Sequence, residues 1–330
     1  MPDRRTRSTT PVILGRGQNR IEKDRNELEQ ALKTYRELVR KDPESYLPYV
    51  AATLNDLGTL DSDQNRPQEA RQEFEEALKI YRELAQKEPE LDLRYVAAAL
   101  NNLGILESDQ SRPEEARQEF EEALKIYRKL AQKEPENYLP YVAVMLNNLG
   151  MLEHRRNRLK EALKTYRALA QRDPENYLPY IALMLNNLGI LDRGRNRLVR
   201  ARRESEEALK IYRELAQKKP EAYLPCVAMM LNSLATLRDT GRIKEARKEY
   251  EEALKIYREL AQKEPNIYLP YVAATLNNLG ILARAQNRSA EARKEYEEAL
   301  KLYEAFAKQD PEQFFPYAKQ LEALLKQLPR

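Results

Sequence analysis

The chain carries amphipathic segments whose apolar residues return every three or four positions, which is the spacing of one face of a helix. In residues 113–133 this stripe includes Ala116, Phe120 and Ala123. A more apolar segment precedes it and begins with a stretch such as "YLPYVA", where proline is tolerated because it lies near the first turn. Together the two segments predict a pair of helices. The "EP" or "DP" dipeptide ends the second helix, since the residue before proline avoids helical geometry.

We expect each pair to bury its own apolar stripe against its neighbours. In one pair the predicted core consists of Val96, Ala99, Leu100, Leu103, Ala116, Phe120, Ala123, Leu124 and Tyr127. Small residues at Gly104 and Ala116 would allow the two helices to approach closely. One pair alone cannot close such a core, so neighbouring pairs must stack.

The paired segments recur along the chain at a nearly constant period. One position of the first helix is held by Tyr49, Tyr95, Tyr141, Tyr180, Cys226, Tyr271 and Tyr317, at spacings of 46, 46, 39, 46, 45 and 46 residues. The second helices carry their own tyrosines, namely Tyr35, Tyr81, Tyr127, Tyr166, Tyr212, Tyr257 and Tyr303. Such a period predicts a stack of about fourteen helices over residues 20–330.

Three segments depart from this period. The unit between Tyr141 and Tyr180 lacks seven residues, which we assign to its second helix; seven residues are almost two turns, so the apolar stripe keeps its phase. Residues 311–330 begin like a first helix but carry polar residues where the others read "LNNLG", as a solubilising cap does. Residues 1–19 form a basic N-terminal segment, and the sequence leaves open whether it is ordered or flexible.

The segment "NNLGILESDQSRPEEARQEF" resembles the tetratricopeptide repeat, with Leu103, Gly104, Ala116, Phe120 and Ala123 at the family's spacing. The resemblance implies an all-α solenoid of stacked antiparallel helix pairs, whose first helices line a concave groove. The units are longer than the usual ~34 residues and resemble the arrays of kinesin light chains and bacterial sensor proteins. The resemblance further implies a non-catalytic scaffold or adaptor that binds a protein or peptide partner.

An asparagine pair recurs in the first helices although asparagine is a poor residue for a helix interior. On a helical wheel both positions lie outside the core, so the resemblance places them in the groove. The candidate peptide-binding residues are Asn55, Asn101, Asn102, Asn147, Asn148, Asn186, Asn187, Asn232, Asn277 and Asn278. The arrays of the O-GlcNAc transferase family carry a similar asparagine row. Its positions correspond here to Asn102, Asn148, Asn187 and Asn278.

Two interpretations of these amides stay open. They can bond the backbone of an extended ligand, because an amide offers both donors and an acceptor. They can instead cap backbone groups or bond to the adjacent first helix. The first position is asparagine in all six copies, whereas Asp56 and Ser233 interrupt the second. The first position is therefore the better structural candidate and the second the better ligand contact.

Neighbouring positions vary and are candidates for specificity. The apolar ones are Val144, Met151, Leu183, Ile190 and Met229, and methionine adapts readily to different ligands. Basic residues follow at the ends of three units, at Arg155, Arg193 and Arg284. This pattern predicts a peptide that is apolar at its centre and acidic where it meets repeats three to six.

Charge supports two further alternatives. The chain has 57 basic and 53 acidic residues and a net charge of +4, so any basic surface is local. Residues 154–160 and 193–203 are rich in arginine and favour either a nucleic-acid or anionic-surface contact, or a solvated edge balanced by glutamates. Aromatic residues that would stack single-stranded bases are not interleaved there. A purely structural, self-assembling array is the other alternative.

The sequence gives little support for catalysis, metal binding or a membrane partner. His154 is the only histidine, and Cys226 stands where other units have tyrosine, so neither has a partner that would activate it. We therefore expect no enzyme activity and no cofactor. A single cysteine is compatible with a reducing compartment, and no apolar run has the length of a signal-peptide core or a membrane span. We expect a cytoplasmic protein.

Overall fold

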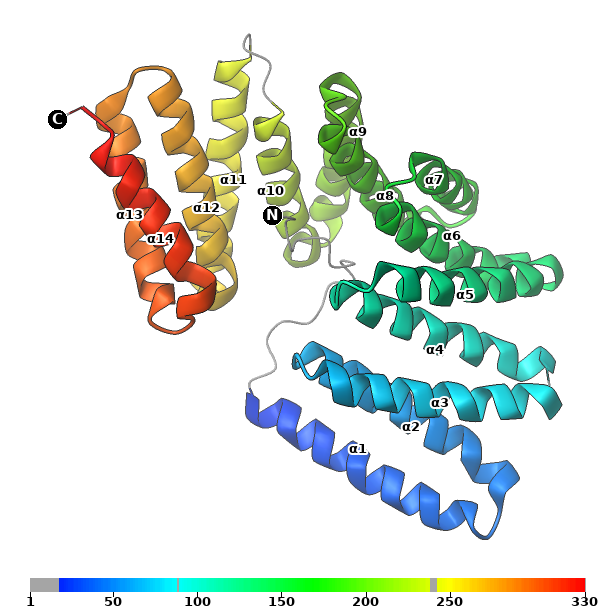
Figure 1. Cartoon of the computed structure of the whole chain (residues 1–330). Helices are drawn as coiled ribbons and strands as arrows, with labels where there is room; N and C mark the ends of the chain where they lie inside the picture. The colour runs from blue at the N-terminus through cyan, green and yellow to red at the C-terminus, as the bar shows by residue number, and fades with distance from the viewer. Residues whose placement is uncertain (1–17, 88, 238–241, 330) are drawn as a thin grey trace. The chain divides into compact units, whose positions relative to one another are not determined.

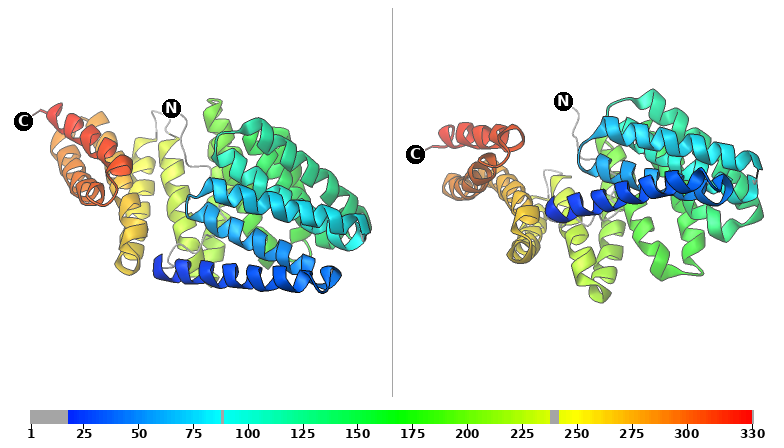
Figure 2. Two further views of the ribbon diagram at one scale, coloured as in Figure 1. Left: turned by 60° about the horizontal axis from the view of Figure 1, so that its bottom comes forward. Right: turned by 90° about the horizontal axis from the view of Figure 1, so that it is seen from below.

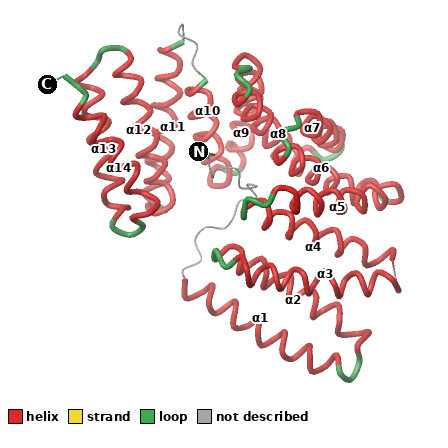
Figure 3. Tube along the Cα trace, in the orientation of Figure 1, coloured by secondary structure: helices red, strands yellow, loops and turns green. Residues whose placement is uncertain are grey.

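A computed structural model describes residues 18–87, 89–237 and 242–329 of the chain. All regular elements in these residues are α-helices, fourteen in number, joined by short turns (Figure 1 and Figure 3). The predicted all-α solenoid of helix pairs is confirmed. Residues 1–17 of the predicted N-terminal segment lie outside the described residues, and α1 begins at Gln18.

The helices form two compact units, Met1–Arg172 and Asp173–Arg330. The first unit contains α1 (Gln18–Val39), α2 (Pro43–Asp63), α3 (Pro67–Lys87), α4 (Pro89–Asp109), α5 (Pro113–Lys133), α6 (Pro135–Leu152) and α7 (Arg156–Ala170). The second contains α8 (Pro174–Gly194), α9 (Leu198–Lys218), α10 (Pro220–Thr236), α11 (Ile243–Lys263), α12 (Pro265–Ala285), α13 (Ser289–Ala307) and α14 (Pro311–Lys326). Within each unit every helix packs on the next one along the chain (Figure 2). We call the even-numbered helices A helices and the odd-numbered ones B helices.

The A helices begin earlier than the sequence pattern predicts. In α6 the first residue is Pro135 of the "EP" dipeptide, so Pro140 lies inside the helix rather than in its first turn. Proline is well suited to the first helical position because its fixed φ is helical and its missing N–H has no partner there. Three A helices also have an aspartate cap; the Asp42 carboxylate, for example, accepts from the Ser45 N–H at 3.2 Å.

The predicted core is confirmed. All nine residues assigned to it in α4 and α5 are at most 5% exposed. The two helices approach closely at Gly104, where an added Cβ would lie 2.6 Å from the ring of Phe120. Gly58 faces Phe74 in the same way. The absence of a side chain on the A helix therefore sets how deeply the ring of the B helix is inserted.

The short unit keeps this contact by a different route from the one predicted. Gly150 faces Leu159, nine residues further on, whereas Gly104 and Phe120 are sixteen apart. Both α6 and α7 are shorter than their counterparts, with 18 and 15 residues against 21 in α4 and α5. The assignment of all seven missing residues to the second helix was wrong. The turn between the helices has moved inward, and Leu159 takes the place of the ring.

The last helix has the polar surface expected of a cap. Lys319 and Glu322 of α14 are exposed. The corresponding residues of α6, Ala143 and Leu146, are buried. Polar side chains at these positions keep the outer side of α14 compatible with water.

Charged residues join neighbouring pairs inside the first unit. The Asp61 carboxylate in α2 is fully buried and accepts from Arg25 of α1 at 2.9 Å. Glu107 of α4 is equally buried and pairs with Arg71 of α3 at 3.2 Å and with Arg112 at 2.9 Å. Arg25 and Arg71 come from the preceding B helix, and Arg112 lies in the turn before α5. Removal of Arg25 or Arg71 would therefore leave a buried charge between two repeats.

Half-buried carboxylates also line the B helices. Burial raises the pKa of Glu119, Glu249 and Glu295. The strongest case is Glu73, whose pKa is raised to about 7 by burial and by repulsion from Asp61, against which Arg25 acts only in part. Ionised Glu73 is therefore a source of instability near neutral pH.

The Gly104→Ala variant should lose about 1–2 kcal/mol of stability, because overpacking against Phe120 outweighs the better helix propensity of alanine. The matched control is Gly194→Ala, where an added Cβ meets nothing within 4 Å. Chemical denaturation followed by circular dichroism measures both. Equal midpoints for the two variants would contradict the proposed role of the glycine contact.

The Glu73→Gln variant should stabilise the protein at pH 8 by about 1 kcal/mol, a value reduced for partial solvent exposure. A carboxyl group with a raised folded pKa costs stability as the pH rises from its ordinary pKa of 4.5 to about 7. The gain should therefore shrink as the pH is lowered toward 4.5. Thermal melts at several pH values test this, with exposed Glu83→Gln as control; a gain that is independent of pH would refute it.

Candidate functional site

One face of the A helices stays open to solvent. In α6 it comprises Tyr141, Val144, Asn148 and Met151, followed by Arg155 just beyond the helix. Their spacing of three and four residues places them on one stripe. Tyr141 and Arg155 are exposed and the other three are half-buried. The same stripe recurs on α2 and α4 in the first unit and on α8, α10 and α12 in the second; we call it the A-helix face.

Exposed tyrosines form one edge of the A-helix face. Their exposed fractions range from 39% to 54%, in Tyr49, Tyr95, Tyr141, Tyr180, Tyr271 and Tyr317. Tyr141 stacks on buried Tyr127 of α5, with ring centroids 5.0 Å apart and planes inclined by 14°. Four other stacked pairs have centroids 5.2 or 5.3 Å apart, namely Tyr35–Tyr49, Tyr81–Tyr95, Tyr257–Tyr271 and Tyr303–Tyr317. In these five pairs the outer ring is thus held in place by the inner one.

In the sequence these tyrosines set the period of the repeat, but their exposed surface was not predicted. A signal was available, because the tyrosine lies seven residues before the second asparagine of each pair. Residues seven apart lie on the same side of a helix. A tyrosine ring on the same helix face as the second asparagine is therefore expected to be exposed to solvent, as that asparagine is.

Cys226 interrupts the tyrosine row in α10. Its side chain is half-buried, and burial raises the pKa of the thiol to about 11. The thiol is therefore protonated at neutral pH and is a weak nucleophile. The inner ring, Tyr212, lies beside Tyr223 instead, with centroids 6.5 Å apart. The geometry agrees with a packing substitution.

Asparagine amides link successive A helices in the first unit. The Asn102 amide donates to Asn55 Oδ1 at 3.0 Å, and the Asn148 amide donates to Asn101 Oδ1 at 3.1 Å. The second asparagine of one helix thus bonds the first asparagine of the helix before it. These bonds match the second of the two interpretations above. Ligand contact by the same amides stays a prediction.

The first asparagine position is more buried than the helical wheel implied. Asn147 and Asn186 are each only 8% exposed, so the expectation that both positions lie outside the core is wrong for them. In the second unit the Asn232 amide donates to the Thr275 hydroxyl at 2.9 Å. The Asn277 side-chain oxygen is buried and has no hydrogen-bond partner among the described residues. Asn187 and Asn278 are half-buried.

The specificity candidates lie on the same face in their respective units. The apolar ones, Val144, Met151, Leu183, Ile190 and Met229, are all half-buried. Arg193 and Arg284 are exposed at the ends of α8 and α12, where they contact the Thr236 hydroxyl at 3.3 Å and the Gln327 amide oxygen at 3.4 Å. Arg155 pairs with Glu153 at 3.2 Å. The first unit thus holds Val144, Met151 and Arg155, and the second holds the others.

His154 proves to be a turn residue. It is exposed and has φ of 53°, in the left-handed region. The same turn position in the other units is held by Asn65, Ser111, Asn196 and Asn287, with φ between 56° and 60°. Within the described ranges no group of metal-ligating residues gathers around it or elsewhere. None of the described helices combines the length and the apolar character that crossing a membrane requires.

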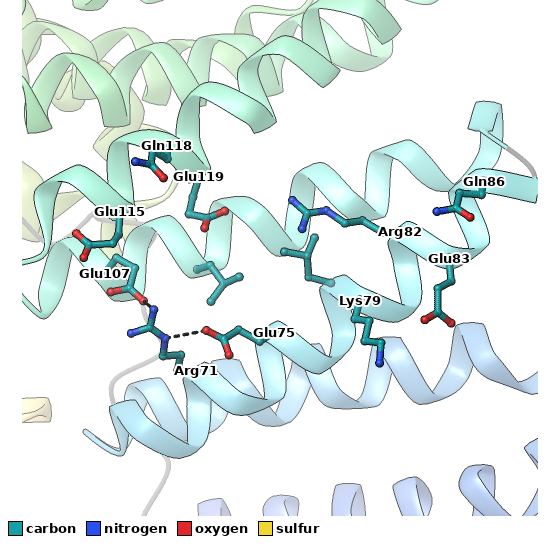
Figure 4. Close-up of a pocket in the computed structure, with 12 residues that line it drawn as sticks. Arg71, Glu75, Lys79, Arg82, Glu83, Gln86, Glu107, Glu115, Gln118 and Glu119 are labelled. Atoms are coloured by element: carbon teal, nitrogen blue, oxygen red, sulfur yellow. Dashed lines mark hydrogen bonds and ion pairs between the residues drawn. The ribbon is translucent and has the colours of Figure 1, made fainter.

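A hollow lies on the other side of the helices, between α3 and α5 (Figure 4). Its floor contains Leu78 and Leu103, and its walls are charged. Arg71 pairs there with Glu75 at 2.8 Å, and Arg82 with Glu122 at 2.9 Å. Because much of this charge is compensated within the protein, the hollow resembles a solvated furrow between adjacent B helices more than a ligand site.

Comparisons with known proteins agree with this architecture. One tetratricopeptide repeat model matches residues 19–83, 141–214 and 258–305, and a second matches residues 96–135 and 227–265. A comparison with curated proteins gave no match. Tetratricopeptide repeats generally act as scaffolds for protein–protein interaction and are typically non-catalytic.

Several solved structures have a similar fold. The apo form of RapI is 16% identical with a TM-score of 0.59, over 92% of this chain and 81% of that one. The type IV pilus biogenesis factor PilW is 17% identical with a TM-score of 0.51, over 84% and 98% of the two chains. A signal transduction ATPase with a tetratricopeptide repeat sensor from Pyrococcus horikoshii is 13% identical with a TM-score of 0.50, over 92% and 50%. At these identities the likeness concerns the fold alone. The family models, which match more than half of the residues, show that the chain belongs to the tetratricopeptide repeat family.

Proposed function

We propose that the chain is a non-catalytic adaptor that binds a peptide or protein segment on the A-helix face. The observation that carries this proposal is the row of exposed tyrosines stacked on buried ones. Tyr141, for example, is 49% exposed, yet its ring is held against Tyr127. A ring that is already ordered loses little entropy when a ligand packs on it, and it offers a large contact area.

In each unit, apolar side chains of the A-helix face fit an apolar stretch of ligand. Val144, Leu183 and Met229 are half-buried, so each leaves part of an apolar side chain accessible. Methionine and branched aliphatic side chains fill irregular contacts well. Because the A helices repeat the same stripe, an extended segment could contact one copy after another within a unit.

The amides have a secondary part in this proposal. In the first unit each bonded amide still has a second N–H and a second lone pair, so it can contact a ligand without breaking the bond to its neighbour. We propose that these remaining donors and acceptors hold the ligand backbone.

Exposed arginines at the ends of the A helices favour an acidic ligand segment. Arg155, Arg193 and Arg284 are all exposed, and their contacts with the protein are few. Guanidinium groups form strong paired hydrogen bonds with carboxylates. Acidic residues that follow the apolar stretch would therefore bind beside them.

The double variant Tyr95→Ala with Tyr141→Ala should weaken ligand binding at least tenfold, since exposed aromatic anchors dominate such interfaces. Peptides selected from a displayed random library on the full chain supply the ligands, and titration calorimetry measures them. Cys226 shows that the fold accepts a smaller residue at this position. The control is Lys79→Ala with Lys125→Ala, two exposed residues of B helices.

Selected peptides that bind both double variants as tightly as the wild type would refute a role for the tyrosine row. Peptides whose binding is weakened in the lysine control but not in the tyrosine double variant would place the binding site on the B helices instead. Circular dichroism of each variant confirms that the helices are intact.

Replacing Arg193 and Arg284 together with serine should weaken peptides that contain acidic residues by about tenfold and flatten their salt dependence. Uncharged peptides should bind as before. The measurement is the same titration at low and high salt. An equal loss for acidic and uncharged peptides would contradict the proposed acidic segment.

A further inference from the structure

The beginning of α9 differs from that of four other B helices. In α3, α5, α11 and α13 the third residue is a glutamate, at Glu69, Glu115, Glu245 and Glu291. In α9 this position is Arg200, and the first turn has no acidic residue. Acidic residues stabilise the first turn of a helix and basic ones destabilise it. Helix stability therefore does not explain the arginine.

Two aliphatic residues open the same helix. Val199 is 87% exposed, more than any other large hydrophobic residue in the described part of the chain, and Leu198 is 36% exposed. The residues that correspond to Val199 are Gln68, Glu114, Lys244 and Ala290. Because the Val199 side chain is exposed, packing within the chain contributes little to its stability.

Arginines flank the valine in the sequence. Arg195, Arg197, Arg200 and Arg203 are all exposed. Arg197 reaches Asp192 only at 3.7 Å, and within the described residues Arg200 and Arg203 form no ion pair. Because Arg200 and Arg203 are three residues apart on one helix, they also repel each other. We call Arg195, Arg197, Leu198, Val199, Arg200 and Arg203 the arginine–valine patch.

We propose that the arginine–valine patch docks on a membrane surface that contains anionic phospholipids, with Val199 inserted between the headgroups. Guanidinium groups bind the phosphates and carboxylates of such lipids. An exposed aliphatic side chain gains free energy where hydrocarbon lies directly beneath the charges. This contact lies on the surface and does not require a spanning helix. It differs from the expectation from sequence, which included no membrane partner.

The patch fits a lipid surface better than nucleic acid. Duplex DNA offers phosphates to the arginines, but its backbone gives Val199 no apolar partner. Single strands bind through aromatic stacking, and the patch contains no aromatic residue. Each arginine increases partitioning onto an anionic membrane by about fivefold, and salt weakens this attraction. The additional contribution of Val199 is therefore measurable beside that of the four arginines.

The test is co-sedimentation of the full chain with vesicles. Vesicles with about 30% phosphatidylserine in phosphatidylcholine should bind the protein, and pure phosphatidylcholine vesicles should not. High salt should release it, because it screens the arginines. These results support the proposal, and failure to bind the phosphatidylserine vesicles overturns it.

Two variants separate the charge from the apolar side chain. Val199→Gln leaves the charge unchanged and should weaken vesicle binding about tenfold. Arg200→Glu with Arg203→Gln should weaken it by tenfold or more. Glutamine and glutamate occur at these positions in α3, so the substitutions suit the fold. The control, Lys244→Glu with Lys248→Gln, makes the same charge change at the matching turn of α11 and should bind like the wild type.

An equal loss in the control would show that net charge alone drives binding and would overturn the proposal. Binding to a short DNA duplex that exceeds vesicle binding and is unaffected by Val199→Gln would assign the patch to nucleic acid instead. The proposal is independent of ligand binding on the A-helix face, because the tyrosine variants described above should sediment with vesicles like the wild type.

Discussion

The architecture depends on how closely each A helix approaches its B helix. Gly104 leaves room for the ring of Phe120, and an added methyl group would lie only 2.6 Å from that ring. A pair joined in this way still exposes apolar residues on both sides, so it must stack on further pairs. The buried ion pairs reinforce the stack, since Arg25 and Arg71 each reach a carboxylate on the next A helix.

Stacking also decides which surfaces are free for partners. Each A helix is packed by B helices and linked to neighbouring A helices, so only a narrow stripe of it meets solvent. Tyr141 belongs to that stripe because its inner side is occupied by Tyr127. The arginine–valine patch is free for a different reason. It lies where a turn meets the first residues of α9, and no following element covers Val199.

The fold could be predicted from the sequence because apolar period, repeat length and turn residues all indicated the same helix pairs. The predicted core around Phe120 is buried throughout. Helix ends were less predictable. The pattern placed Pro140 in a first turn, but Pro135 takes the first helical position and the helix begins sooner. The sequence pattern also assigned the missing residues of the short unit to the wrong place. The period of the apolar residues shows which face of a helix is buried, but it does not show where the turn between two helices lies.

The candidate site was predictable in part. The sequence identified the amides and the variable apolar positions, and it left open whether the amides contact a ligand or each other. The 3.1 Å bond from Asn148 to Asn101 was not predictable from the sequence, because it joins residues 47 apart in the chain. The exposed tyrosines were missed because aromatic residues are commonly taken as core. Stacking of one ring on another makes half of each pair interior and half exterior.

The short unit has an implication for how such chains change length. Gly150 and Leu159 reproduce the contact of Gly104 and Phe120 with seven fewer residues between them. Seven residues return a helix nearly to its starting angle. The turn between two helices can therefore shift by seven residues without changing the packing contact between the glycine and the side chain that faces it. Insertions or deletions of seven residues are thus a natural unit of variation for this scaffold. They would change the length of the helices in a repeat while preserving its packing against the next repeat.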